Sequence, residues 1–184
     1  MTRGPRLVVV SGPSGVGKTS VVAELERRKG FERVVTATTR APRGAEKDGV
    51  DYRFLPREEF LRLREAGEFL EWAEVHGQLY GTPRRAVEEV LRRGRHALLN
   101  VDVQGAAAVR GSRLPRLLVF LLPPSLAVLE ARLRGRGTDD PAAVRRRLAA
   151  AQAELARQDE FDVKVVSDTV AAAADRIEAA LAGE

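Results

Sequence analysis

Cysteine is absent from this chain of 184 residues, histidine occurs only twice and tryptophan once. Without cysteine there is neither a disulfide framework nor thiolate chemistry, which fits a reducing cytoplasm, where we expect the protein to act. Two histidines disfavour a histidine-based metal site. Long apolar runs are also absent, and the run over 7–10 lies too close to the motif at residue 12 to be a signal peptide. We therefore expect no membrane partner.

Aromatic residues make up only 5% of the chain, too few for the stacking platform with which single-strand binders hold bases. The formal charge is +5, and arginine supplies most of the positive charge because lysine occurs only four times. Arginine binds phosphate groups in a bidentate manner and stays charged when partly buried. The arginines of interest gather in two small groups rather than along a stripe, so we expect small phosphorylated substrates and no nucleic acid.

One stretch matches the G-x-x-x-x-G-K-[ST] pattern of a phosphate-binding loop. A β-branched apolar run over 7–10 precedes it and an amphipathic stretch over 19–29 follows it, so the loop joins a strand to a helix, as the motif requires. Glycines let backbone N–H groups surround phosphate oxygens, and the N-terminus of the helix adds its positive dipole. We expect the lysine to hold the outer phosphates and the threonine hydroxyl to ligate Mg²⁺. The nucleoside triphosphate site comprises Gly12, Pro13, Ser14, Gly15, Val16, Gly17, Lys18 and Thr19.

Strands and helices alternate along most of the chain, which predicts an α/β fold with a parallel sheet flanked by helices. We expect strands over 7–10, 34–35, 50–55, 69–75, 96–101, 116–122 and 163–166. We expect helices over 19–29, 56–66, 83–93, after Gly105, over 126–133 and 141–157, and from Asp168 onward. A loop over 36–49, a turn over 77–81 and a Thr82 cap on the third helix complete the prediction.

The chain is long enough for one core with small appended lobes. We interpret residues 1–184 as a single domain, whose core comprises about 1–32, 82–124 and 163–184. Two insertions leave this core: a mixed one over about 33–81 and a helical, arginine-rich one over about 125–162. Because the C-termini of parallel strands share one edge of the sheet, the phosphate-binding loop and Asp102 should lie on the same edge.

Polar side chains gather in the first insertion. Arg40 and Arg43 flank Pro42, which restricts the loop, so both guanidinium groups can point at one phosphate monoester. A solvated basic loop accounts for these two residues equally well. Further donors and acceptors in this insertion and at its borders are Thr36, Glu46, Tyr52, Glu71, Tyr80 and Thr82. A glutamate on a strand is more often exposed than a ligand, and nothing near His76 or His96 requires an imidazole that titrates.

Several motifs, in this order, make the chain resemble the guanylate kinase family, which phosphorylates GMP with ATP. Besides the phosphate-binding loop they are Thr38–Arg43, Asp51–Phe54, Phe69–Ala73, Leu79–Thr82, Asp102–Gly105, Pro123–Ser125 and Arg132–Thr138. The resemblance covers essentially the whole chain. It implies a P-loop NTPase fold, a GMP-binding insertion over about 33–81, a lid over about 125–162, and Mg²⁺ bound with ATP.

The resemblance also implies roles for individual residues. The phosphate of GMP would be held by Arg40, Arg43, Tyr52 and Tyr80, with Glu46 in the same loop. Glu71 would read guanine, with Thr36, Thr82 and Asp102 close to the base. Guanine presents N1–H and N2–H₂ donors side by side, and one carboxylate accepts from both. Adenine has an unprotonated N1 at that place, so it would leave buried acceptors facing each other.

For the lid, the resemblance implies that Arg136 and Arg147 close over the transferring phosphoryl group, with help from Arg132. Guanidinium groups stabilise the negative charge that a loose transition state spreads over the phosphoryl oxygens. The expected catalytic set is Lys18, Arg43, Arg136 and Arg147. We interpret Arg134, Arg145 and Arg146 as a solvated helix face.

Two positions depart from the family pattern. Asn100 stands where an acidic residue is common, and Ser167 precedes Asp168 where asparagine is usual near the adenine. Two alternatives to a GMP kinase remain: a non-catalytic guanylate-kinase-like module that binds proteins, and a P-loop kinase that acts on a phosphorylated sugar. Such modules typically lose the loop glycines or lysine, which are present here, and Glu71 argues for a nucleobase. We expect a monomer or a homodimer.

Overall fold

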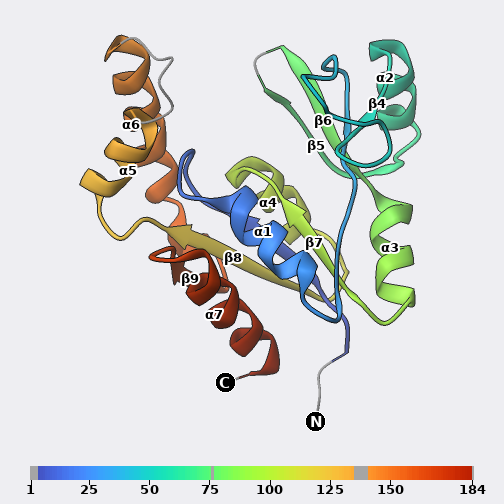
Figure 1. Cartoon of the computed structure of the whole chain (residues 1–184). Coiled ribbons are helices and arrows are strands. Elements are labelled where there is room, and N and C mark those ends of the chain that lie inside the picture. The colour runs from blue at the N-terminus through green and yellow to red at the C-terminus, as the bar shows by residue number, and fades with distance from the viewer. Residues whose placement is uncertain (1–3, 76, 135–140, 184) are drawn as a thin grey trace.

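A parallel five-stranded sheet forms the centre of the protein, as a computed structural model shows for residues 4–75, 77–134 and 141–183, with only the backbone described at 141–143 (Figure 1). The strand order is β2-β7-β1-β8-β9, and every neighbouring pair is parallel. The strands are β1 (Leu7–Ser11), β2 (Phe31–Arg33), β7 (His96–Asn100), β8 (Arg116–Leu122) and β9 (Val163–Val166). The predicted α/β class is confirmed.

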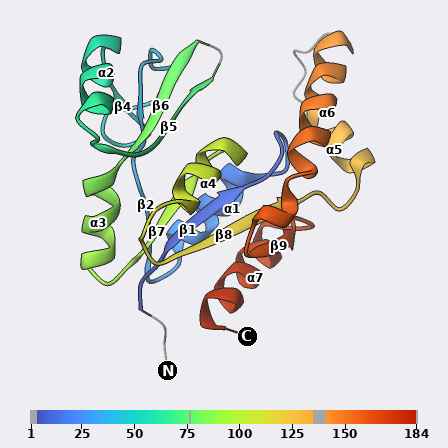
Figure 2. The same cartoon turned by 180° about the vertical axis from the view of Figure 1, so that it is seen from behind.

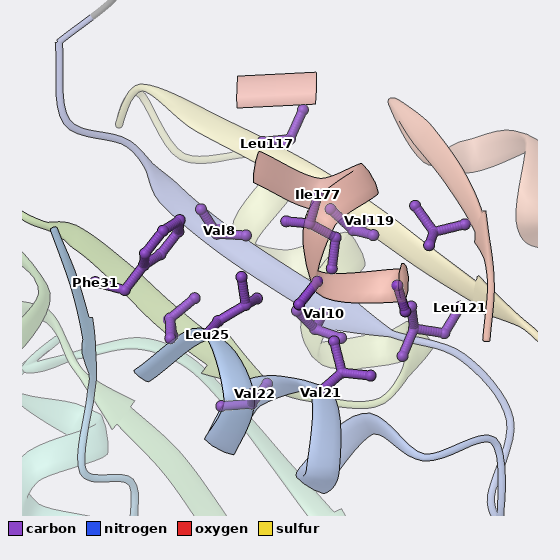
Figure 3. Close-up of a cluster of buried hydrophobic side chains, with 14 of the residues drawn as sticks. Val8, Val10, Val21, Val22, Leu25, Phe31, Leu117, Val119, Leu121 and Ile177 are labelled. Carbon is purple, nitrogen blue, oxygen red and sulfur yellow. The ribbon is translucent and has the colours of Figure 1, made fainter. Parts of the chain in front are cut away.

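Helices α1 (Lys18–Arg27) and α7 (Val170–Ala182) cover one face of this sheet. Alternate side chains of β1, Val8 and Val10, are fully buried there. They pack with the apolar side of α1 and with Ile177 of α7 (Figure 3). Burial of apolar surface on this face fixes the strand that leads into the phosphate-binding loop and the helix that leaves it.

Helices α3 (Arg84–Arg92) and α4 (Val103–Arg110) cover the opposite face, where Leu7 and Val9 point. Phe120 of β8 packs edge-on against Phe161, with ring centroids 4.9 Å apart. The view from behind shows α4 lying across the strands on this side (Figure 2). Both faces of the sheet are therefore covered, as the near-continuous apolar strands predict.

A second, four-stranded sheet has the order β4-β3-β6-β5. Its strands are β3 (Ala37–Thr38), β4 (Arg53–Phe54), β5 (Phe69–Val75) and β6 (Gln78–Pro83), and α2 (Arg57–Glu65) packs on it. The β3–β4 pair is parallel and the other pairs are antiparallel, so the predicted mixed insertion is present. Phe60 and Phe69 stack at its centre, with ring centroids 4.4 Å apart.

Helices α5 (Leu126–Arg134) and α6 (Pro141–Leu155) lie on the other side of the phosphate-binding loop from the mixed sheet (Figures 1 and 2). Leu129 and Leu133 of α5 pack against Ala151 of α6. A short 3-10 helix, η1 (Gln158–Glu160), leads to β9. None of the described helices is both long and apolar enough to cross a membrane.

Four elements predicted between residues 34 and 81 differ from the structure. The strand predicted at 34–35 lies at Phe31–Arg33 in the parallel sheet, and Val34 follows it with its side chain buried and its N–H bonded to the backbone oxygen of Leu98. The predicted loop over 36–49 contains β3, which pairs with β6. The predicted strand over 50–55 is only Arg53–Phe54, because the backbone N–H groups of Val50 and Asp51 bond to Lys47 in a turn. The predicted turn over 77–81 is shorter, since β6 begins at Gln78.

The ends of several helices also differ from the prediction, in three cases because of a side-chain hydrogen bond. Thr82 lies in β6 rather than capping α3, because its hydroxyl donates to Glu71. The helix expected after Gly105 begins at Val103, since Asp102 accepts a hydrogen bond from the N–H of Gly105. The last helix is capped by Thr169 instead of beginning at Asp168. The long helix predicted to residue 157 ends at Leu155.

Candidate active site at the edge of the parallel sheet

The phosphate-binding loop joins the C-terminal end of β1 to the first turn of α1, as the motif requires. Gly12 has a φ of 138°, and a Cβ atom at this position would lie 2.5 Å from the backbone oxygen of Leu121. Gly17 has a φ of 106° and directly precedes α1. Both positions therefore exclude a side chain, one by close approach and both by backbone conformation.

Lys18 lies at the start of α1 and curls back over the loop. Its Nζ donates to the backbone oxygens of Gly12, at 2.6 Å, and of Pro13, at 3.2 Å. The lysine charge is thus held at the loop, where it can meet an anion. The first turn of α1 carries no acidic residue, so its positive dipole faces the loop unopposed by the helix itself.

Thr19 and Asn100 lie side by side at the same edge. The Nδ2 of Asn100, the last residue of β7, donates to the Thr19 hydroxyl oxygen at 3.2 Å. Among the described residues no cluster of histidine and carboxylate groups forms a closed metal site. Mg²⁺ bound with a nucleotide needs few protein ligands, because phosphate and water oxygens fill most of its shell. The hard oxygen of Thr19 beside the loop fits such an ion.

Arg40, Glu46 and two tyrosines form a connected cluster on the mixed sheet. The Arg40 guanidinium donates to Glu46 at 2.9 Å, lies over the ring of Tyr52 at 5.3 Å from its centroid, and is close enough to the phenol of Tyr80 to interact with it. The bond to Glu46 raises the pKa of Arg40 further above its ordinary value. The two tyrosine rings meet edge-on, with centroids 6.1 Å apart. This network holds one guanidinium and two phenols in place before any ligand arrives.

Glu46 also accepts a hydrogen bond from the backbone N–H of Arg43, at 2.8 Å. The carboxylate of Glu46 thus joins the two arginines of the loop that Pro42 restricts. The hydrogen bonds from Arg40 and from the backbone of Arg43 lower the pKa of Glu46. Arg43 itself is exposed. In this arrangement Glu46 positions the two arginines, and a direct contact of Glu46 with GMP stays a prediction.

Glu71 is the most unusual residue of the site, because its carboxylate is buried with only 6% of the residue exposed. The hydroxyl of Thr82, on the neighbouring strand, donates to its Oε1 at 2.5 Å. Burial raises the pKa of Glu71 to about 7, the bond from Thr82 opposes this rise, and the negative charge of Asp102 adds to it. Each carboxylate oxygen has two lone pairs, so a buried carboxylate that accepts from Thr82 can also accept from a ligand donor.

Gly105 of α4 lies against this carboxylate. A Cβ atom on Gly105 would be 3.1 Å from Oε2 of Glu71 and 3.0 Å from Cβ of Val101. The glycine therefore lets the first turn of α4, capped by Asp102, approach the mixed sheet closely. Thr36 lies half-buried beside β3, and its backbone oxygen accepts from the N–H of Arg53. The structure thus brings together Glu71, Thr82 and Asp102, three of the four residues predicted to lie at the base.

Three arginines are predicted to belong to a lid. Arg132 donates to the backbone oxygens of Val16, in the phosphate-binding loop, and of Ser167, both at 3.2 Å. Arg147 lies on α6 with its side chain exposed. The predicted Arg136 lies outside the described residues. Asp168 is bound by Arg176, which lowers its pKa to about 2.

Two residues at the site were not predicted from the sequence. Glu154 of α6 accepts a hydrogen bond from the backbone N–H of Ser14 at 3.3 Å, and Gly105 lies against Glu71. Gly105 ends the Asp102–Gly105 motif, but the motif gave it no role of its own, and Glu154 belongs to none of the motifs. Their positions depend on how α6 and α4 pack against the loop and the mixed sheet, which no local sequence signal reports.

A hollow of about 630 Å³ lies at the opposite end of the parallel sheet. It is lined by residues that precede β1 and β8 and by part of α3: Gly4, Pro5, Arg6, Glu88, Leu91, Arg92, Leu114 and Pro115. It is mostly apolar and lies at the N-terminal ends of the strands, whereas open α/β sheets bind ligands at the C-terminal ends. We therefore assign the site to the edge that carries the phosphate-binding loop.

Comparison with known proteins identifies the family of the chain. The family model of guanylate kinase matches residues 4–184. A guanylate kinase of Rhodococcus jostii is 51% identical over 181 residues, covering 97% of this chain and 87% of that protein. One of Streptomyces kasugaensis is 53% identical over 169 residues, covering 90% and 82%. The crystal structure of guanylate kinase from Anaplasma phagocytophilum is 35% identical with a TM-score of 0.77, covering 97% of this chain and 85% of that chain. The chain belongs to the guanylate kinase family.

Proposed function

We propose that this protein transfers the γ-phosphoryl group of ATP to GMP, giving GDP and ADP. The observation that carries the proposal is the buried carboxylate of Glu71, bonded to Thr82 and set against α4. Its two carboxylate oxygens form an acceptor edge, which matches the adjacent N1–H and N2–H₂ donors of guanine. AMP would bring an acceptor to the same place and leave buried polar groups unpaired.

The phosphate of GMP fits the cluster on the same mixed sheet. Arg40 is held by Glu46, Tyr52 and Tyr80, and Arg43 lies in the same restricted loop. Fixed guanidinium groups bind a phosphate monoester with less loss of conformational freedom than mobile ones. We propose that this insertion, over about 33–81, carries GMP toward the ATP held at Lys18.

In the reaction an oxygen of the GMP phosphate attacks the γ-phosphorus of ATP, and the bond from that phosphorus to the bridging oxygen of ADP breaks. Magnesium, bound with ATP and held through Thr19, would neutralise charge on the phosphate oxygens. Lys18 and the lid arginines Arg136 and Arg147 would stabilise the charge of the transferring group. Closure of the lid, over about 125–162, would exclude water and so prevent hydrolysis of ATP. We place this reaction in the cytoplasm.

A coupled assay of ADP release tests the proposal. Wild-type protein should turn over ATP with Mg²⁺ only when GMP is added. Lys18→Ala should reduce kcat about 10²- to 10³-fold, the usual effect of removing one group that stabilises transition-state charge. Lys29→Ala, at an exposed lysine just after α1, is the matched control and should keep the wild-type rate.

Two results would contradict the proposal, and a third would contradict the role of Lys18. Absence of GMP-dependent ADP release would favour a non-catalytic module. Turnover of a phosphorylated sugar without a nucleobase would favour the sugar kinase. A Lys18→Ala variant that works at the wild-type rate would remove the lysine from the catalytic set.

A further inference from the structure

A carboxylate from the lid reaches into the phosphate-binding loop. Glu154 lies near the C-terminal end of α6, and its Oε2 accepts a hydrogen bond from the backbone N–H of Ser14 at 3.3 Å. The two residues are 140 positions apart in the chain. Ser14 lies in the middle of the loop, whose N–H groups bind phosphate oxygens in proteins with this motif. The bond therefore gives an anionic side chain a donor that suits a phosphate.

The charges around Glu154 agree with this position. Burial raises the pKa of its carboxyl group, while the positive charge of Lys18 and the N–H of Ser14 lower it. Asp102 adds a smaller effect in the direction of burial. Glu154 is thus close enough to Lys18 for the two opposite charges to attract each other. The first turn of α1 has no acidic residue of its own that could neutralise the charge of Lys18.

The lid is joined to the loop at a second point. A Cβ atom at Gly15 would lie 2.9 Å from Cδ2 of Leu133, so α5 packs directly against the residue next to Ser14. Leu133 belongs to the cluster that holds α5 and α6 together through Ala151. Glu154 and Leu133 thus bring both lid helices into contact with the loop.

Glu154 shares a helix face with Arg147. Residues 147, 151 and 154 are spaced by four and three positions, so they lie on one side of α6. Ala151 between them is buried and the side chain of Arg147 is exposed, so this side borders the packed face of α6. A movement that takes Glu154 away from Ser14 therefore also moves the backbone that carries Arg147.

We infer that Glu154 occupies an anion position of the phosphate-binding loop, and that the phosphates of the donor displace it. The exchange couples donor binding to the position of α6. Glu154 is a positioning residue in this scheme, because it acts through the loop and the helix rather than on the reacting atoms. The inference rests on the proposed function in that ATP is the donor that replaces the carboxylate.

Binding measurements without GMP test this inference. Calorimetry with ATP·Mg²⁺ and with inorganic tripolyphosphate should give dissociation constants about tenfold lower for Glu154→Gln than for the wild type. A competing charge-assisted hydrogen bond of ordinary strength has an effect of this order. Tripolyphosphate lacks the nucleoside, so an equal gain for both probes places the effect at the loop. Glu130→Gln is the control: it removes the same charge from α5, where Glu130 pairs with Arg134 on the surface.

A second readout reports the contact itself. In amide NMR spectra of the protein without ligand, the Ser14 signal should shift strongly in Glu154→Gln and stay in place in Glu130→Gln. Equal or weaker binding of both probes by Glu154→Gln, or an unchanged Ser14 signal, would overturn the inference. If tripolyphosphate shows the gain while no variant binds ATP, the inference about the loop stands and ATP as the donor is refuted.

Discussion

The buried carboxylate of Glu71 should lower the free energy of unfolding at neutral pH, because burial disfavours its ionised form. Replacing it by glutamine keeps the size and a hydrogen-bond acceptor for Thr82 but removes the charge. The pKa of Glu71 rises from 4.5 to about 7, chiefly by burial. One unit of pKa corresponds to about 1.4 kcal/mol, so the ionised group opposes folding by roughly 3 kcal/mol. With only 6% of the residue exposed, water screens little of this effect.

The sign of the pH dependence follows from proton uptake. Between pH 4.5 and about 7 the folded protein holds a proton on Glu71 that the unfolded chain has lost. The free energy of unfolding therefore falls through this range as pH rises. Above about pH 7 the contribution of Glu71 no longer changes with pH. At pH 8 we expect Glu71→Gln to be more stable than the wild type by up to about 3 kcal/mol, and at pH 5 by less than about 1 kcal/mol.

Urea unfolding of both proteins at pH 5, 6, 7 and 8 measures this difference, and the contributions of all other groups cancel in the comparison. Calorimetry should show the opposite effect on function: Glu71→Gln should bind GMP at least tenfold more weakly at pH 8, because a neutral amide cannot accept from two guanine donors as a carboxylate does. A stability difference that is absent, reversed or independent of pH would refute the assignment of Glu71 as a buried, proton-linked carboxylate.

Two further variants test the surroundings of the site. Gly105→Ala should raise the KM for GMP about tenfold with little change in the KM for ATP, because its Cβ would crowd Oε2 of Glu71; steady-state kinetics with each substrate varied will show this, and an equal rise in both KM values would contradict it. Asn100→Asp should lower the Mg²⁺ concentration that gives half-maximal rate, since it places a negative charge beside the Thr19 hydroxyl; an unchanged Mg²⁺ titration would show that Asn100 does not act near the metal.

Four of the five strands of the parallel sheet could be predicted closely from their apolar runs, whereas β2 was predicted at 34–35 and lies at Phe31–Arg33. The expected run 116–122 and the observed β8 coincide, and the glycine motif located the loop after β1. The mixed sheet was harder, since β3 and β4 have two residues each. Strands this short are specified by their partners across the sheet rather than by their own pattern.

The side chains of the site could be predicted as a set but not in their connections. Thr82 had the pattern of a helix cap, and only the antiparallel pairing of β5 with β6 brings its hydroxyl to Glu71. The link from Glu46 to Arg40 likewise depends on the fold of the loop. The contact of Glu154 with Ser14 joins residues 140 positions apart, and tertiary packing alone produces it.

The initial rate with ATP and Mg²⁺ against GMP, AMP, CMP and UMP tests most directly whether this site phosphorylates guanine nucleotide. The buried acceptor edge of Glu71 predicts that kcat/KM for GMP exceeds that for AMP by at least about 10³-fold, the discrimination typical of sites with buried polar groups that the wrong substrate leaves unpaired. CMP and UMP should be as poor as AMP. A value for AMP within about tenfold of that for GMP would contradict the reading of guanine by this carboxylate.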